Sequence, residues 1–127
     1  MHPVAVRYLE VDAQGVVFNM WYLAYVDDAM TAFLTARGAP YPALIAGGHD
    51  VQLVHAELDW RGGLRWQDPV GVAVRAVSVG RTSFRLGFDF RRDGTSVATA
   101  EVVYVCVGID GSGKRDLPGR LRAALDG

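Results

Sequence analysis

Alternation of apolar and polar residues runs through most of the chain and predicts five β-strands. The first is expected to begin near Val4 and end near Glu10, and the others to cover residues 51–60, 69–79, 83–92 and 96–107. Segment 83–92 is the clearest, since its phenylalanines and its leucine share one face. Segment 96–107 is apolar on both faces, as is typical of a central strand. In segment 51–60, one face is expected to carry Val54, Ala56, Leu58 and Trp60.

The period changes after Met20, where apolar residues recur every three or four positions and predict an amphipathic helix. Asn19 is a suitable N-cap and Gly38 a suitable C-terminal stop, which gives a helix about 25 Å long. Residues 38–50 are rich in Pro and Gly and are expected to form a loop, with one short helical turn over 41–46. A short helix is expected over 117–125.

The order of elements is strand, long helix, then four strands joined by hairpin-scale connections, one of them the tight turn Asp93-Gly94. One helix cannot cover both faces of a five-stranded antiparallel sheet. We therefore expect a single α+β domain over residues 1–127, with the sheet wrapped around the helix. An exposed edge or face would be closed by a second copy of the chain.

Composition and charge narrow the possible functions. Half of the 127 residues are apolar, 21% are charged, and the formal net charge is −1. A charge so close to neutral does not favour nucleic acid as a partner. The chain has neither a signal-like segment nor an apolar run near 20 residues, so we expect a cytoplasmic protein without a membrane partner. The single cysteine, Cys106, allows no disulfide within the chain and no metal cluster.

Candidate chemistry is concentrated where the first strand gives way to the helix. Asp12 ends the strand, Gly15 follows three residues later, and Asn19 precedes the helix. This order places a carboxylate near a helix N-terminus, where unpaired N–H groups are available. A carboxylate together with oriented N–H donors can hydrolyse an activated acyl group.

The same segment carries a family pattern. Asp12, Gly15, Val17, Asn19 and Tyr22 follow the order Asp-x-x-Gly-x-Val-x-(His/Asn)-x-x-Tyr. In this the chain resembles the hotdog-fold acyl-CoA thioesterases of the 4-hydroxybenzoyl-CoA thioesterase type. The resemblance implies a five-stranded antiparallel sheet around one long central helix, and hydrolysis of an acyl-CoA to free acid and CoA. It also implies no separate cofactor, and a homodimer or homotetramer with active sites at the subunit interface.

The resemblance suggests roles for the residues of the motif. Asp12 would act as general base or nucleophile, and backbone N–H groups of Gly15 and Val16 would help to place the thioester carbonyl. A further oxyanion donor would come from the partner subunit, at the start of the strand over 51–60. By position the donor would be the N–H of Asp50 or Val51, of which we choose Val51; Asp50 stands where some members of the family have Gly.

Other residues are candidates for substrate binding. Asn19 either caps the helix, which we favour, or orients water, and Tyr22 lies either in the core or in an acyl pocket. The turn Gly80-Arg81-Thr82-Ser83 resembles the family's Gly-x-(Thr/Lys)-Ser turn, so Arg81, Thr82 and Ser83 are candidates for pantetheine or phosphate contact. An ordinary hairpin with a surface arginine is the alternative. Glu10 is expected to be a solvated or salt-bridged strand residue.

Two rival functions fit the same fold. A hydratase or dehydratase acting on acyl thioesters usually needs a histidine at the helix, where this chain has Asn19. A non-catalytic acyl-thioester-binding module would have no need of a carboxylate such as Asp12. Hydrolysis of an acyl-CoA is therefore the function we predict.

Overall fold

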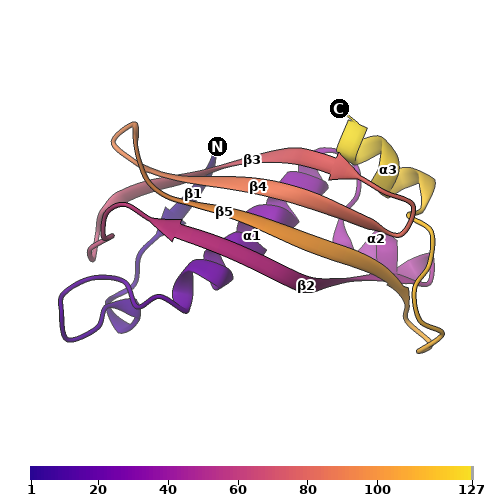
Figure 1. Ribbon diagram of the computed structural model, residues 1–127, viewed down its shortest axis with the longest axis horizontal. Helices are drawn as coiled ribbons and strands as arrows, with labels where there is room; N and C mark the ends of the chain where they lie inside the picture. Colours follow the sequence, from indigo (N-terminus) through magenta and orange to yellow (C-terminus); the bar gives the residue numbers. More distant parts are fainter. Residues whose placement is uncertain (127) are drawn as a thin grey trace.

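In the computed structural model, which describes residues 1–126, five strands form one antiparallel sheet in the order β1-β3-β4-β5-β2 (Figure 1). The strands are β1 (His2–Ala5), β2 (His49–Trp60), β3 (Pro69–Val79), β4 (Ser83–Arg92) and β5 (Thr95–Gly108). The helices are the 3₁₀ turn η1 (Tyr8–Glu10), α1 (Trp21–Ala36), α2 (Tyr41–Ala46) and α3 (Gly119–Asp126). Four strands, the long helix and both short helices therefore form where the sequence predicted them. No helix within residues 1–126 is long and apolar enough to cross a membrane.

The curled sheet wraps around α1, whose buried side chains form one core with the inner sheet face (Figure 1). The helix contributes Tyr22, Tyr25, Val26, Ala29 and Leu34. The predicted phenylalanine and leucine face of β4 points into this core, and so does one of the two apolar faces of β5. The architecture is the hotdog fold, as expected.

The first strand is shorter than predicted. It ends at Ala5 instead of near Glu10, and the chain then forms η1. The physical reason lies in the neighbouring strand, because Ala5 pairs with Pro69, the first residue of β3. Proline has no N–H with which to continue the ladder. Glu10 is therefore released from the sheet and turns inward.

Strand β2 forms one open edge of the sheet, since it pairs only with β5. Its register shifts between Leu53 and His55, which leaves Val54 as an extra, exposed residue at a β-bulge. The predicted shared face is therefore wrong at Val54, although Ala56 and Leu58 do pack against the core. Period-two reasoning cannot detect one added residue.

The start of α1 also differs from the prediction. Asn19 is exposed and makes no cap, since Met20 takes the N-cap position without a side-chain bond. The carbonyls of Phe18, Asn19 and Met20 instead accept the N–H groups three residues further on. At the other end, Gly38 stops the helix with φ +90°, as predicted. The Asp93-Gly94 turn has positive φ at both residues, the signature of a type I′ hairpin.

Candidate active site

Asp12 lies in a small hairpin that connects η1 to α1. A bridge between Val11 and Val17 closes this hairpin. The Asp12 N–H donates to the Val16 carbonyl at 2.9 Å, and the Gly15 N–H donates to the Asp12 carbonyl at 3.0 Å. Oδ1 of Asp12 accepts the Gln14 N–H at 2.8 Å, whereas Oδ2 accepts no hydrogen bond from residues 1–126. The half-buried carboxylate thus keeps one oxygen for a ligand or water.

The two candidate N–H donors beside Asp12 differ. The N–H of Gly15 is used inside the turn, where φ of +80° explains the need for glycine. The N–H of Val16 donates to no acceptor within the described residues. Of the two, Val16 is therefore the donor available to a carbonyl oxygen.

The loop between β2 and β3 holds the second half of the hairpin in place. The Val17 N–H donates to the Leu64 carbonyl at 2.7 Å. The Val16 side chain lies so close to Gly63 that a Cβ added there would be 2.8 Å from Val16 Cγ1. The loop between β2 and β3 is therefore shaped to receive the hairpin.

Glu10, just before the hairpin, binds Tyr25 of α1, and its burial was not predicted from the sequence. Glu10 forms a salt bridge with Arg7, which was one of the two alternatives expected, but it is only 3% exposed. Burial raises the pKa of Glu10, but hydrogen bonds from the Tyr25 hydroxyl and from Arg7 outweigh this effect and leave the pKa below its ordinary value. A charged residue at a strand end gave no signal that it would lie inside.

Of the two candidate binding residues near the helix start, neither lines a pocket with Asp12. Asn19 is exposed. Tyr22 is 1% exposed and packs edge-on against Trp60 and Phe90, with ring centroids 5.8 and 5.3 Å away. This placement favours the core role for Tyr22 over contact with substrate.

The turn with Arg81, Thr82 and Ser83 joins β3 to β4. Arg81 is exposed, and its guanidinium contacts Asp116 at 2.7 Å. The carbonyl of Thr82 accepts the Cys106 N–H at 2.8 Å. Half-buried Ser83 accepts the Gly80 N–H through its carbonyl. The backbone of the turn is thus fixed, while the Arg81 side chain faces solvent.

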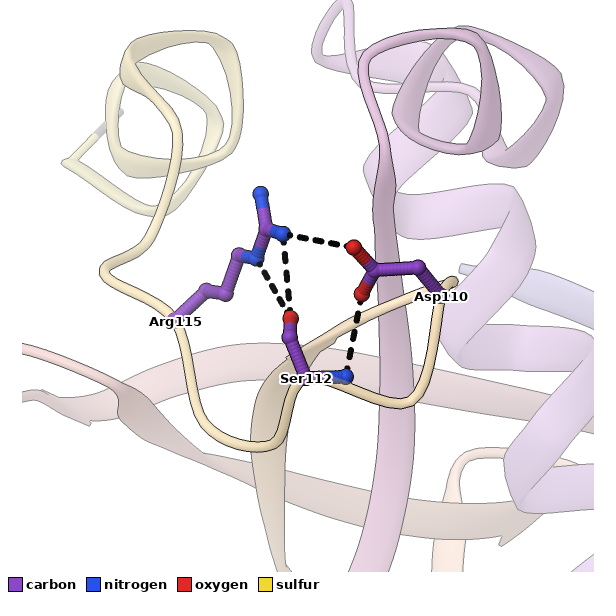
Figure 2. Close-up of polar contacts among 3 residues, drawn as sticks. All are labelled: Asp110, Ser112 and Arg115. Atoms are coloured by element: carbon purple, nitrogen blue, oxygen red, sulfur yellow. Dashed lines mark hydrogen bonds and ion pairs between the residues drawn. The ribbon is translucent and has the colours of Figure 1, made fainter.

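A loop of mixed charge, with two basic and two acidic residues, lies beside this turn and was not singled out from the sequence. It follows β5 and contains Lys114 and Arg115. Figure 2 shows that the Arg115 guanidinium turns back onto its own loop, where it contacts Ser112 Oγ at 3.0 Å and Asp110 at 3.3 Å. Arg115 is therefore held inside the loop, and Arg81 and Lys114 are the more accessible cations.

The N–H of Val51, a predicted oxyanion donor, is occupied in this structure. It donates to Oδ1 of its own neighbour Asp50 at 2.7 Å. The same carboxylate raises the pKa of the Tyr41 hydroxyl, which lies beside it. A carbonyl oxygen could bind to Val51 only after the Asp50 side chain had moved.

A cavity of about 400 Å³ opens between α1, α2 and the start of β2. Its walls combine apolar side chains with two carboxylates and two hydroxyls; they are Asp27, Met30, Thr31, Leu34, Ala39, Tyr41, Leu44, Asp50 and Val51. Burial, and then the neighbouring Asp28, raise the pKa of Asp27. The Tyr104 hydroxyl is not part of these walls: it is fully buried without a partner among the described residues, and burial together with the charge of Asp27 raises its pKa. Hydrogen-bonding groups therefore gather in an otherwise apolar cavity.

The segments that carry the predicted site residues lie at opposite ends of the sheet (Figure 1). The Asp12 hairpin lies at the end where β2 finishes and β3 begins, because its residue Val17 binds the Leu64 carbonyl in the loop between these strands. Val51 and Arg81 lie at the other end, beside α2 and α3. The 11 residues of β3 span about 35 Å between these ends. One chain alone does not bring the two groups together.

Comparison with known proteins identifies relatives across nearly the whole chain. Residues 6–125 match the thioesterase-like superfamily. A 1,4-dihydroxy-2-naphthoyl-CoA hydrolase of Synechococcus elongatus is 27% identical over 119 residues, which cover 92% of this chain and 88% of that protein.

Solved structures agree with this result. A gentisyl-coenzyme A thioesterase is 25% identical, with a TM-score of 0.90 and 98% of each chain covered. A hypothetical protein from Thermus thermophilus is 27% identical, with a TM-score of 0.91, covering 98% of this chain and 95% of that one.

Proposed function

The chain belongs to the thioesterase-like superfamily, and we propose that it hydrolyses the thioester of an aromatic acyl-CoA with Asp12 as the reacting carboxylate. Membership confirms the family suggested by the Asp12–Tyr22 motif, and with it an enzyme that hydrolyses CoA thioesters. The observation that carries the Asp12 assignment is that, within residues 1–126, neither Asp12 Oδ2 nor the Val16 N–H of the same hairpin has a hydrogen-bond partner. Together they supply a base or nucleophile and a donor for the developing oxyanion.

Two routes use this arrangement. In the first, Asp12 takes a proton from water as the water oxygen attacks the carbonyl carbon; the C–S bond then breaks and the thiolate receives that proton. In the second, Asp12 attacks the carbonyl itself, expels CoA thiolate and forms a mixed anhydride that water hydrolyses. Both routes end in free acid and CoA, and neither needs a separate cofactor.

We propose that two chains share each site through their β2 edges. Antiparallel pairing of two β2 strands about a two-fold axis would place the Val51 end of one chain beside the Asp12 end of the other. The open edge of β2 and the separation of Asp12 from Arg81 within one chain both support this arrangement. The CoA phosphates would then lie near Arg81, Thr82 and Ser83 of one chain, and the thioester would lie near Asp12 of the other chain.

The acyl group is proposed to enter the cavity between α1, α2 and β2. Its volume suits a small ring system, and its apolar walls suit an aromatic face. Asp27 and the hydroxyls of Thr31 and Tyr41 in its wall favour an acyl group that carries its own hydroxyl groups. The names of two relatives, a dihydroxynaphthoyl-CoA hydrolase and a gentisyl-CoA thioesterase, point to the same class.

The test is thiol release from hydroxybenzoyl-CoA, dihydroxybenzoyl-CoA, benzoyl-CoA and octanoyl-CoA. Each substrate is assayed with the wild type and with the Asp27→Asn variant. We expect the hydroxylated substrates to have the highest kcat/KM. Asp27→Asn should lower kcat/KM about tenfold for them alone, the value of one charge-assisted hydrogen bond. Preference for octanoyl-CoA would contradict the acyl class, and binding without thiol release from any substrate would contradict hydrolysis.

A further inference from the structure

Glu10 is the one buried charged residue among residues 1–126, and the chemistry proposed above does not use it. Its Oε1 accepts the Tyr25 hydroxyl at 2.6 Å and the Arg7 N–H at 2.9 Å, and its Oε2 accepts Arg7 Nε at 2.9 Å. Tyr25 is itself buried in α1. The carboxylate is thus fully engaged by the helix on one side and by its own turn on the other.

A buried carboxylate is a costly way to hold two segments together. Apolar residues of similar volume often stabilise a fold as well or better, and a buried charge is destabilising once a partner is lost. What a short bond between charged and hydroxyl groups supplies is a defined distance and direction. That property matters at the position that Glu10 occupies, two residues before Asp12.

The backbone carries this geometry from Glu10 to Asp12. The Glu10 carbonyl accepts the Phe18 N–H at 2.9 Å, while the Asp12 N–H donates to the Val16 carbonyl at 2.9 Å. Both strands of the Asp12 hairpin are therefore connected to Glu10. A shift of Glu10 relative to α1 would move the whole hairpin.

We propose that Glu10 and Tyr25 are positioning residues that set the place of the Asp12 carboxylate relative to α1 and the bound thioester. The inference rests on the proposed role of Asp12. It adds that the hydroxyl of Tyr25, which touches neither Asp12 nor the acyl cavity, controls the rate of the chemical step.

The test compares Tyr25→Phe with the wild type in steady-state thiol release, each normalised to folded protein. Loss of the hydroxyl leaves the ring in the core, so the variant is expected to fold. We expect kcat to fall at least tenfold while KM changes less than twofold, since small displacements of reacting groups reduce rates steeply. Tyr8→Phe is the matched control, because it removes an exposed hydroxyl from η1, the turn that contains Glu10, and should change neither constant.

Glu10→Gln provides a second variant should Tyr25→Phe prove too unstable to assay, and it is expected to show the same fall in kcat at unchanged KM. A kcat within twofold of wild type in a folded variant would overturn the positioning role. Loss of folded protein with normal kcat per folded molecule would do so too, because it would assign the pair to stability alone. Full activity of Asp12→Asn would contradict the proposed function, which these outcomes do not affect.

Discussion

Asp50 offers the most specific prediction, because its side chain occupies a donor that the proposed reaction requires. If Val51 stabilises the oxyanion, each turnover must first break the 2.7 Å bond between the Val51 N–H and Asp50 Oδ1. Replacing Asp50 by alanine removes that competitor and leaves the strand backbone unchanged. We therefore predict that Asp50→Ala is more active than the wild type.

The size of the gain follows from the bond. Hydrogen bonds to charged groups contribute roughly 1.5–3 kcal/mol, but Asp50 is only half-buried, so solvent reduces this to about 1 kcal/mol. At about 1.4 kcal/mol per tenfold change, the expected gain in kcat/KM is about fivefold. Asp50→Asn should gain less, since its amide oxygen can still accept the Val51 N–H.

The assay is thiol release at substrate concentrations well below KM, with Asp59→Ala as control. Asp59 lies exposed on the same strand and is expected to be neutral. An unchanged or lower kcat/KM for a folded Asp50→Ala variant would refute the reasoning. Either result would mean that Val51 is not the donor or that Asp50 itself assists the reaction.

Two further predictions concern charge. Burial raises the pKa of Glu10, but Tyr25 and Arg7 lower it by more, so the pKa in the folded state is below its ordinary value. The ionised Glu10 therefore stabilises the fold at pH values above its unfolded-state pKa of about 4.3, and this stability is lost as the pH falls through the folded-state pKa. Wild type should therefore lose thermal stability below about pH 4 more steeply than Glu10→Gln, and parallel melting curves would contradict this. Arg81→Ala should raise KM about fivefold with kcat unchanged, an effect that shrinks with added salt because the side chain is exposed; a KM insensitive to both would remove Arg81 from phosphate binding.

The fold could be read from the sequence where local patterns are complete. The phenylalanine face of β4, the period change before α1 and the Asp93-Gly94 turn each fix a structure within a few residues. Where the outcome depended on a distant partner, local patterns failed. The end of β1, for example, is set by Pro69, which lies on the paired strand β3 and is distant in sequence.

The candidate site shows the same division. The motif could single out Asp12 as the candidate carboxylate, because the motif is local. It could not show that Glu10 turns inward to Tyr25, since a charged strand-end residue is usually exposed. Nor could spacing show that Asp50 binds the Val51 N–H, or that Arg81 lies at the far end of the sheet from Asp12, because these depend on topology and side-chain rotamers.

The most direct measurement is the kcat of Asp12→Asn on the wild type's best acyl-CoA substrate, with Asp59→Asn as matched control and melting curves for both. The amide keeps the size of the side chain and can still accept the Gln14 N–H, so the variant should fold normally. The account predicts a loss of at least 100-fold in kcat for Asp12→Asn and none for Asp59→Asn, consistent with removal of a general base or nucleophile. Turnover of Asp12→Asn close to that of the wild type would contradict the account.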